Sequence, residues 1–153
     1  LNEIQPGLEN LSTTYKKDAL LKAKIKEIGN KYLSHGTTLI HGDFYPGSWM
    51  AKKEQVYIID PEFSFLGFPE FDLGVLAAHS ILITKNKAAL STIVKQYPSA
   101  IDYELLSQIT GIEIMRRLIG LAQLPITLSL KEKESLLQLA YPLIMRSGNN
   151  TTT

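Results

Sequence analysis

The chain has 153 residues, of which 44% are hydrophobic and 20% charged, the composition of a globular domain with its own core. Its net charge of +1 gives no electrostatic case for nucleic acid or an anionic membrane, and neither a membrane-spanning run nor a signal peptide is visible. The absence of cysteine excludes disulfides and thiolate metal sites, and it fits a reducing compartment such as the cytoplasm. A first residue of Leu1 instead of Met suggests a fragment or a processed chain.

The first third of the chain predicts a loop followed by one helix. Pro6, Gly7 and a Ser-Thr-Thr cluster indicate a lead-in loop over residues 1–14. Apolar residues at helical spacing predict a helix over 16–34, with a solvated lysine face and Gly36 as its C-terminal cap.

Short apolar runs predict a strand over 37–41, a loop over 42–47 and a hairpin of strands 48–52 and 55–59. A two-residue turn at Lys53-Glu54 pairs Trp49 with Ile58 and brings Ser48 close to Asp60. Because both faces of the hairpin are apolar, we expect it to be buried.

The remainder predicts a Phe/Gly-rich loop and then helices. The loop covers 61–69, the helices cover 70–83, 87–97, 102–124 and 129–146, and a polar, frayed tail covers 149–153. A capping box, Ser129 with Glu132, opens the last helix. The predicted fold class is therefore mostly α with a small β-hairpin, in one domain over residues 1–148.

Two carboxylates at strand ends carry the chemistry. Asp43 follows the predicted strand over 37–41, and Asp60, with Glu62 close behind it, follows the hairpin strand over 55–59. Phosphoryl transfer needs a group that orients the acceptor hydroxyl and oxygen ligands for Mg²⁺, so we assign the first role to Asp43 and the second to Asp60 and Glu62. Two unit charges about 4 Å apart repel by roughly 4 kcal/mol at a dielectric of 20, so we expect a cation among these carboxylates.

The segment His41-Gly42-Asp43, followed by Pro46-Gly47-Ser48, resembles the catalytic loop of the aminoglycoside phosphotransferase and choline kinase superfamily. The resemblance implies a protein-kinase-like fold with Asp43 as catalytic base and Asp60 as a metal ligand. That family has a metal-binding Asn at the position of Ser48. Since a hydroxyl is a weaker ligand than an amide oxygen, Glu62 is the candidate to replace it.

Three further segments narrow the resemblance to methylthioribose kinases: Asp60-Pro61-Glu62-Phe63, Phe71-Asp72-Leu73-Gly74, and the Glu-x-x-Arg-Arg-x-x-Gly-Leu-Ala stretch within 111–122. The resemblance implies phosphorylation of the ribose hydroxyl of 5-methylthioribose by ATP with Mg²⁺, in methionine salvage. It places Arg116 and Arg117 on the substrate side, against the simpler interpretation of an i,i+4 ion pair between Glu113 and Arg117. It also gives His41 and Asp72 a loop-stabilising role.

A kinase of this kind also needs a glycine-rich loop and a strand lysine over the phosphates, and neither is visible here. The chain therefore resembles the C-terminal lobe alone. We expect the missing N-terminal lobe as a partner, and we expect weak ATP binding and little turnover without it. Alternatives are an aminoglycoside, choline or homoserine acceptor, or a non-catalytic kinase-like binding domain. A metal-dependent hydrolase lacks histidine ligands, and a homodimer is left open.

Overall fold

The computed structural model describes residues 5–124 and 126–146, so the predicted tail over 149–153 lies outside the described residues. The elements follow in this order: α1 (Leu8–Lys17), α2 (Ala19–Tyr32), β1 (Thr38–Ile40), a 3₁₀ turn (Pro46–Ser48), β2 (Trp49–Lys52), β3 (Gln55–Ile58), a 3₁₀ turn (Pro61–Phe63), β4 (Phe65–Gly67), α3 (Pro69–Thr84), α4 (Ala89–Gln96), α5 (Tyr103–Ile119) and α6 (Leu130–Ile144). The predicted class, mostly helical with a small antiparallel hairpin, is confirmed.

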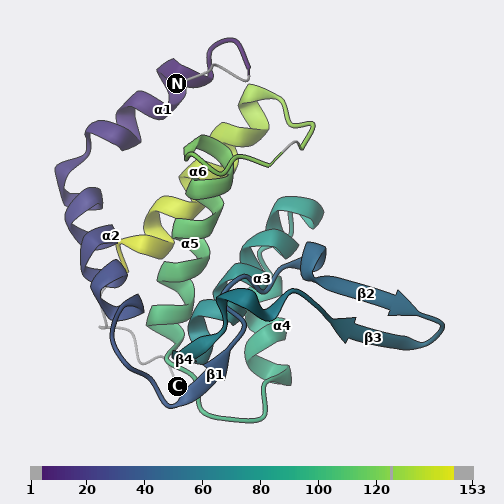
Figure 1. Cartoon of the computed structure of the whole chain (residues 1–153). Coiled ribbons are helices and arrows are strands. Elements are labelled where there is room, and N and C mark those ends of the chain that lie inside the picture. The colour runs from purple at the N-terminus through teal and green to yellow at the C-terminus, as the bar shows by residue number, and fades with distance from the viewer. Residues whose placement is uncertain (1–4, 125, 147–153) are drawn as a thin grey trace.

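The core forms around α5, which packs on α3 on one side and on α6 on the other (Figure 1). Leu106, Ile114 and Leu118 of α5 are completely or almost completely buried. A Cβ at Gly111 would lie 2.6 Å from the carbonyl oxygen of Ala140, so the glycine lets α5 and α6 approach closely. This three-helix unit is the rigid base on which the loops rest.

A short antiparallel pair, β1 with β4, places the segment that leads to Asp43 beside the start of α3. Ile40 lies opposite Phe65, and Thr38 lies opposite Gly67. The prediction of a loop over 61–69 is wrong here, because that stretch contains β4. Three residues are too few to show the alternation by which a strand is predicted.

The β2–β3 hairpin has the predicted two-residue turn and register. Trp49 pairs with Ile58, and the Ile59 N–H donates to the Ser48 carbonyl at 2.9 Å. The ladder begins at Trp49, because residues 46–48 form a 3₁₀ turn instead of strand.

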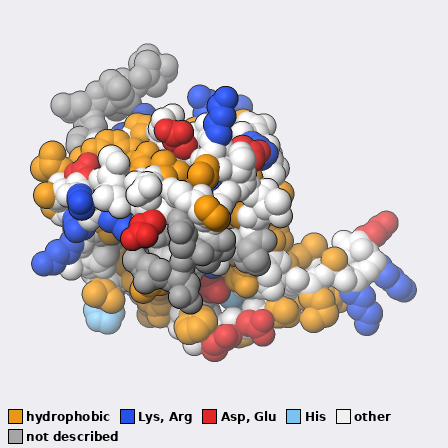
Figure 2. Space-filling model, turned by 90° about the horizontal axis from the view of Figure 1, so that it is seen from above, with side chains coloured by type: hydrophobic (Ala, Val, Ile, Leu, Met, Phe, Trp, Pro, Cys, Tyr) orange, Lys and Arg blue, Asp and Glu red, His pale blue; other side chains and the backbone are white. Residues whose placement is uncertain are grey.

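The expectation that the hairpin is buried is wrong. The hairpin projects from the helical body, with hydrophobic side chains along it and charged ones at its tip (Figures 1 and 2). Val56 is 66% exposed, Ile58 55% and Met50 52%. Apolar strand faces predict that a surface is covered, but they do not say by which part of a protein.

The N-terminal third differs from the prediction in two places. Helix α1 covers residues 8–17, so residues 8–14 are helical instead of the predicted loop, and Leu8 and Ser12 on its inner face are buried. The single predicted helix is broken at Asp18, whose backbone is extended and whose Oδ1 accepts the Leu21 N–H at 2.9 Å as the N-cap of α2. The predicted cap Gly36 lies beyond the end of α2 and donates its N–H to the Leu66 carbonyl of β4.

The last two helices follow the sequence more closely. The Ser129–Glu132 capping box opens α6 as predicted. Helix α5 ends at Ile119 instead of Leu124, because the backbone turns extended at Gly120. No helix within the described part of the chain has the length and apolar character that crossing a membrane requires.

Candidate active site

The loop that carries Asp43 is held by the first turn of α3. Asp72 Oδ2 accepts the backbone N–H of His41 at 2.6 Å, and Oδ1 accepts that of Gly42 at 3.0 Å. Burial raises the pKa of Asp72, and the two backbone hydrogen bonds oppose that rise. The carboxylate thereby fixes the direction in which the chain leaves β1.

The Asp43 loop and the turn at Asp60 lie against each other. Gly42 has φ 84°, and a Cβ there would overlap the carbonyl oxygen of Phe63, so this position requires glycine on both counts. His41 Nε2 lies 2.8 Å from the Ile59 carbonyl oxygen, while Nδ1 accepts the Asp43 N–H at 3.3 Å. The pattern assigns the ring proton to Nε2 and makes His41 a bridge between the two loops.

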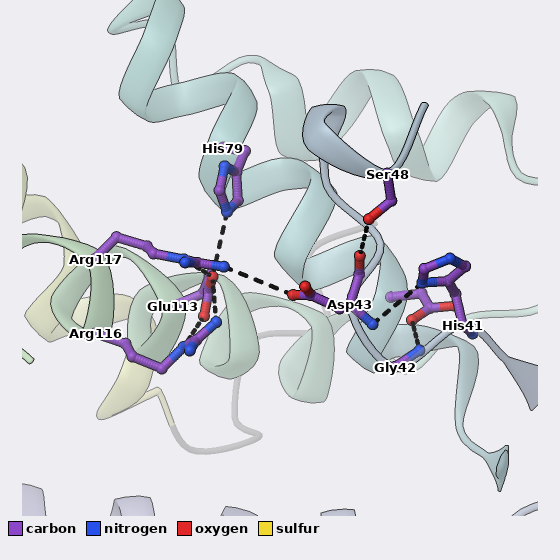
Figure 3. Close-up of polar contacts among 9 residues, drawn as sticks. His41, Gly42, Asp43, Ser48, His79, Glu113, Arg116 and Arg117 are labelled. Atoms are coloured by element: carbon purple, nitrogen blue, oxygen red, sulfur yellow. Dashed lines mark hydrogen bonds and ion pairs between the residues drawn. The ribbon is translucent and has the colours of Figure 1, made fainter. Parts of the chain in front are cut away.

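Ser48 closes the loop from its far end. Its buried hydroxyl donates to the Asp43 carbonyl oxygen at 2.8 Å, five residues back (Figure 3). The hydroxyl proton is therefore used within the loop. Both lone pairs of Oγ remain, but Ser48 is only 4% exposed, which gives a metal ion little access to them. This geometry favours loop closure over the metal contact predicted for Ser48.

Asp60 and Glu62 occupy the turn beyond the hairpin, and both are exposed. Asp60 adopts the left-handed conformation, with φ 58° and ψ 56°. Among the residues that the structure describes, no three acidic or histidine side chains form a ready cage for a metal ion. The close gathering of carboxylates expected from the sequence is therefore not found in that form.

The donor set nevertheless fits Mg²⁺. This ion prefers oxygen ligands, usually keeps several waters, and is commonly held by one or two carboxylates together with substrate phosphates. Asp60 and Glu62 offer two accessible carboxylates next to the Asp43 loop, and no closed cage is needed.

The arginine pair on α5 is organised by Glu113. Arg116 donates from Nε to Oε2 at 2.6 Å and from Nη2 to Oε1 at 3.0 Å, and Arg117 Nε donates to Oε1 at 2.6 Å. Burial alone would raise the pKa of Glu113, but hydrogen bonds from His79, Arg116 and Arg117 offset burial and bring the pKa to about 2. The i,i+4 pair of Glu113 with Arg117 thus exists, within a larger network.

Arg117 also faces Asp43. Its Nη2 lies 3.6 Å from Asp43 Oδ1, an ion pair that is longer than a hydrogen bond, as Figure 3 shows between α5 and the loop. The structure therefore brings together Asp43 and Arg117, two of the residues singled out from the sequence.

A cavity of about 560 Å³ opens beside Asp43, within the size range of small-molecule sites. Its polar groups belong to Asp43, Asp72, Glu113, Arg116 and Arg117. Apolar side chains, chiefly of α2, α3 and α5, supply most of the remaining wall: Ile25, Ile28, Tyr32, Phe63, Phe71, Val75, Ile109 and Ile112. A ligand with hydroxyls at one end and an apolar group at the other matches this lining.

Three residues around Asp43 and the arginine pair have no functional role predicted from the sequence: Glu113, His79 and Tyr45. Glu113 carries a signal, since it stands three and four residues before the arginines. His79 carries none, because only the packing of α3 on α5 brings its Nε2 to 3.3 Å from Glu113 Oε1.

Comparison with known proteins agrees with the predicted kinase-like fold class. Residues 8–109 match the phosphotransferase enzyme family. The chain is similar to the methylthioribose kinase of Exiguobacterium sibiricum, with 38% identity over 78 residues, which cover 51% of this chain and 20% of that protein. It is also similar to methylthioribose kinase 1 of Oryza sativa subsp. japonica, with 35% identity over 77 residues, covering 50% and 18%.

A longer match is to the methylthioribose kinase of Geobacillus sp. (strain WCH70), with 30% identity over 155 aligned positions, covering 79% of this chain and 39% of that protein. The chain thus spans about two fifths or less of the length of these relatives.

Proposed function

The chain belongs to the phosphotransferase enzyme family, and on that basis we propose that it is the C-terminal, catalytic and acceptor-binding lobe of an ATP-dependent kinase. The acceptor is a sugar hydroxyl, and 5-methylthioribose is the sugar that fits best. The observation that carries the proposal is the joint placement of Asp43, Arg116 and Arg117 at the mouth of one largely apolar cavity.

Asp43 is the acceptor-side residue. Its carboxylate is one-third exposed at the cavity, while its backbone is fixed by hydrogen bonds to His41 and Ser48. A carboxylate so placed orients the attacking hydroxyl and accepts its proton as the phosphoryl group is transferred. The hydrogen bonds of the His41 ring, and those that the Asp72 carboxylate of α3 accepts from the loop backbone, support loop-stabilising roles for both residues.

Asp60 and Glu62 are the residues that would hold Mg²⁺, with Ser48 a weaker third candidate. When bound, Mg²⁺ neutralises negative charge on the transferring phosphates. The contacts of His41 with Ile59 and of Gly42 with Phe63 keep the Asp60 turn at a fixed place beside Asp43.

The cavity lining supports this acceptor. Ile25, Ile28 and Ile112 offer an apolar surface suited to a methylthio group, and Asp43 with the arginine heads suits sugar hydroxyls. The side chain of Arg116 is 43% exposed, so its guanidinium has N–H donors left for sugar hydroxyls beyond those that Glu113 accepts.

The exposed hairpin supports an N-terminal lobe as partner. Val56 and Ile58 form an apolar strip on one face of this projecting element, and Met50 and Tyr57 lie on the other face, so the hairpin carries apolar surface that most monomeric proteins keep covered. We propose that the nucleotide lobe covers this strip and brings ATP to Asp60.

The test is a substrate panel with a kinase that contains this chain together with its N-terminal lobe. Phosphate transfer from ATP is measured to 5-methylthioribose, ribose, kanamycin, choline and homoserine. We expect 5-methylthioribose to have the highest kcat/KM, with ribose lower because it lacks the apolar group. Preference for kanamycin, choline or homoserine would reject the assignment of 5-methylthioribose and of ribose-type sugars, and preference for ribose would reject 5-methylthioribose alone. No Mg²⁺-dependent transfer to any acceptor would favour a non-catalytic binding domain.

A further inference from the structure

Arg117 stands between two carboxylates at unequal distances. Its Nε lies 2.6 Å from Glu113 Oε1, whereas its Nη2 lies 3.6 Å from Asp43 Oδ1. The Arg117 side chain is 11% exposed, so both attractions act with little solvent screening. The contact with Glu113 is a charge-assisted hydrogen bond and is the stronger of the two, whereas the contact with Asp43 is a longer ion pair.

The consequence for Asp43 is specific. A guanidinium that closed on Asp43 would form two parallel hydrogen bonds with it and occupy both carboxylate oxygens. The acceptor hydroxyl would then lose the oxygen that orients it. The partner that keeps Arg117 at 3.6 Å is Glu113, which takes the Nε donor.

We propose that Glu113 is a positioning residue that holds Arg117 off Asp43 and so leaves the Asp43 carboxylate open to the acceptor. This proposal rests on the proposed kinase function. Glu113 acts through Arg117, and nothing in the proposal requires Glu113 to touch the substrate.

Glu113 is itself held in place. It is 4% exposed on α5, and His79 of α3, which is 3% exposed, faces its Oε1 at 3.3 Å. The Tyr45 ring, from the loop that carries Asp43, contacts two partners of Glu113: its centroid lies 5.0 Å from that of His79 and 5.4 Å from Arg117 Cζ. The carboxylate is therefore held by partners on two helices, and the loop that it serves packs on two of those partners.

Neither arginine lacks a negative partner in this arrangement. Glu113 pairs with both arginines, and Asp43 adds a longer ion pair to Arg117, so the largely buried charge of Arg117 is compensated while Arg116 is 43% exposed. The low pKa of Glu113 agrees with a carboxylate that stays ionised throughout the working pH range.

The unmodified chain permits a first test by NMR. It contains only three arginines, and Arg146, exposed beside Tyr103, serves as an internal control. We expect the Nε–Hε protons of Arg116 and Arg117 to exchange with water at least about tenfold more slowly than that of Arg146, because Glu113 binds both. Equal exchange of all three would overturn the proposal without reference to activity or to any variant.

Kinetics on the two-lobe kinase test the holding of Arg117. Glu113→Gln keeps the shape but loses the charge, so we expect kcat at saturating acceptor to fall about tenfold to a hundredfold. In Glu113→Gln/Arg117→Met the guanidinium that covers Asp43 is gone, so kcat should rise at least about threefold above that of Glu113→Gln, even as the acceptor KM worsens. The control is Glu27→Gln, the same change in an exposed pair with Lys24, with kcat unchanged.

The kinetic results distinguish failure of this proposal from failure of the kinase function. The proposal is overturned, with the kinase function intact, if kcat for Glu113→Gln lies within about twofold of wild type. It is also overturned if the double variant has a lower kcat than Glu113→Gln. If Glu113→Gln does not fold, the variants His79→Leu and His79→Gln replace it. A lower kcat in His79→Leu together with a recovered kcat in His79→Gln supports the proposal. Equal kcat values in the two variants contradict it. A wild-type kinase with no transfer to any acceptor refutes the proposed function, whatever the NMR result.

Discussion

The hydrogen bonds that the buried Glu113 accepts make the stability of this chain depend on pH in a defined window. The pKa of Glu113 falls from an ordinary 4.5 to about 2 in the folded chain, because hydrogen bonds from its three partners outweigh the cost of burial. At about 1.4 kcal/mol per pH unit, that interval corresponds to roughly 3 kcal/mol. Since the folded pKa lies below the unfolded one, this stabilisation is complete above about pH 4.5 and is lost as the pH falls toward 2.

The assay is urea denaturation of wild type and Glu113→Gln between pH 7 and pH 2.5. We expect the free energy of unfolding of the variant to lie below that of wild type at pH 7 by several kcal/mol, because two arginines lose a buried partner. The difference should shrink by up to roughly 3 kcal/mol as the pH falls, since wild type then loses the same charge.

Glu132 is the matched control. Its pKa is also lowered to about 2, chiefly by its hydrogen bond with Lys85, but the pair is exposed on the surface. Solvent screening should leave the difference between wild type and Glu132→Gln almost independent of pH. A constant difference for Glu113→Gln from pH 7 to pH 2.5 would refute the reasoning from burial.

Three further substitutions test the site. Gly42→Ala should lower the free energy of unfolding by at least about 2 kcal/mol in urea denaturation, because the backbone is left-handed there and the new Cβ would clash with a carbonyl oxygen. The control is Gly29→Ala, where a Cβ meets no other atom, and it should be neutral or stabilising. In the two-lobe kinase, Asp60→Ala should abolish the rise in melting temperature given by ATP with Mg²⁺, and Glu54→Ala at the hairpin tip should retain it. Arg116→Ala should raise the acceptor KM at least about fivefold with little change in the KM for ATP, and equal rises in both would remove Arg116 from the acceptor site.

The sequence was informative where a local rule decides the structure. The capping box at Ser129, the turn at Lys53-Glu54 and the hairpin register all follow from residues close together in the chain, and all three are confirmed. The helix break at Asp18 was missed, although an N-cap residue marked it.

Tertiary contacts explain the other differences. The strand β4 exists because β1 pairs with it from 25 or more residues away, and no pattern within three residues could show this. In the same way, the sequence spacing of Glu113 and the two arginines predicts their contact, but the contact of Glu113 with His79 depends on how α3 packs against α5. The roles predicted for Asp43, Asp60, Glu62 and the arginines are supported by their placement and stay predictions until the variants are measured.

The most direct test of the account is Asp43→Asn in the kinase that carries both lobes, with turnover and ATP affinity measured on the same preparation. The account predicts that kcat falls at least about a hundredfold while the dissociation constant for ATP with Mg²⁺ changes less than about threefold, because Asp43 serves the acceptor and not the nucleotide. Comparable losses of turnover and of ATP affinity would contradict it and make Asp43 a structural residue of the loop.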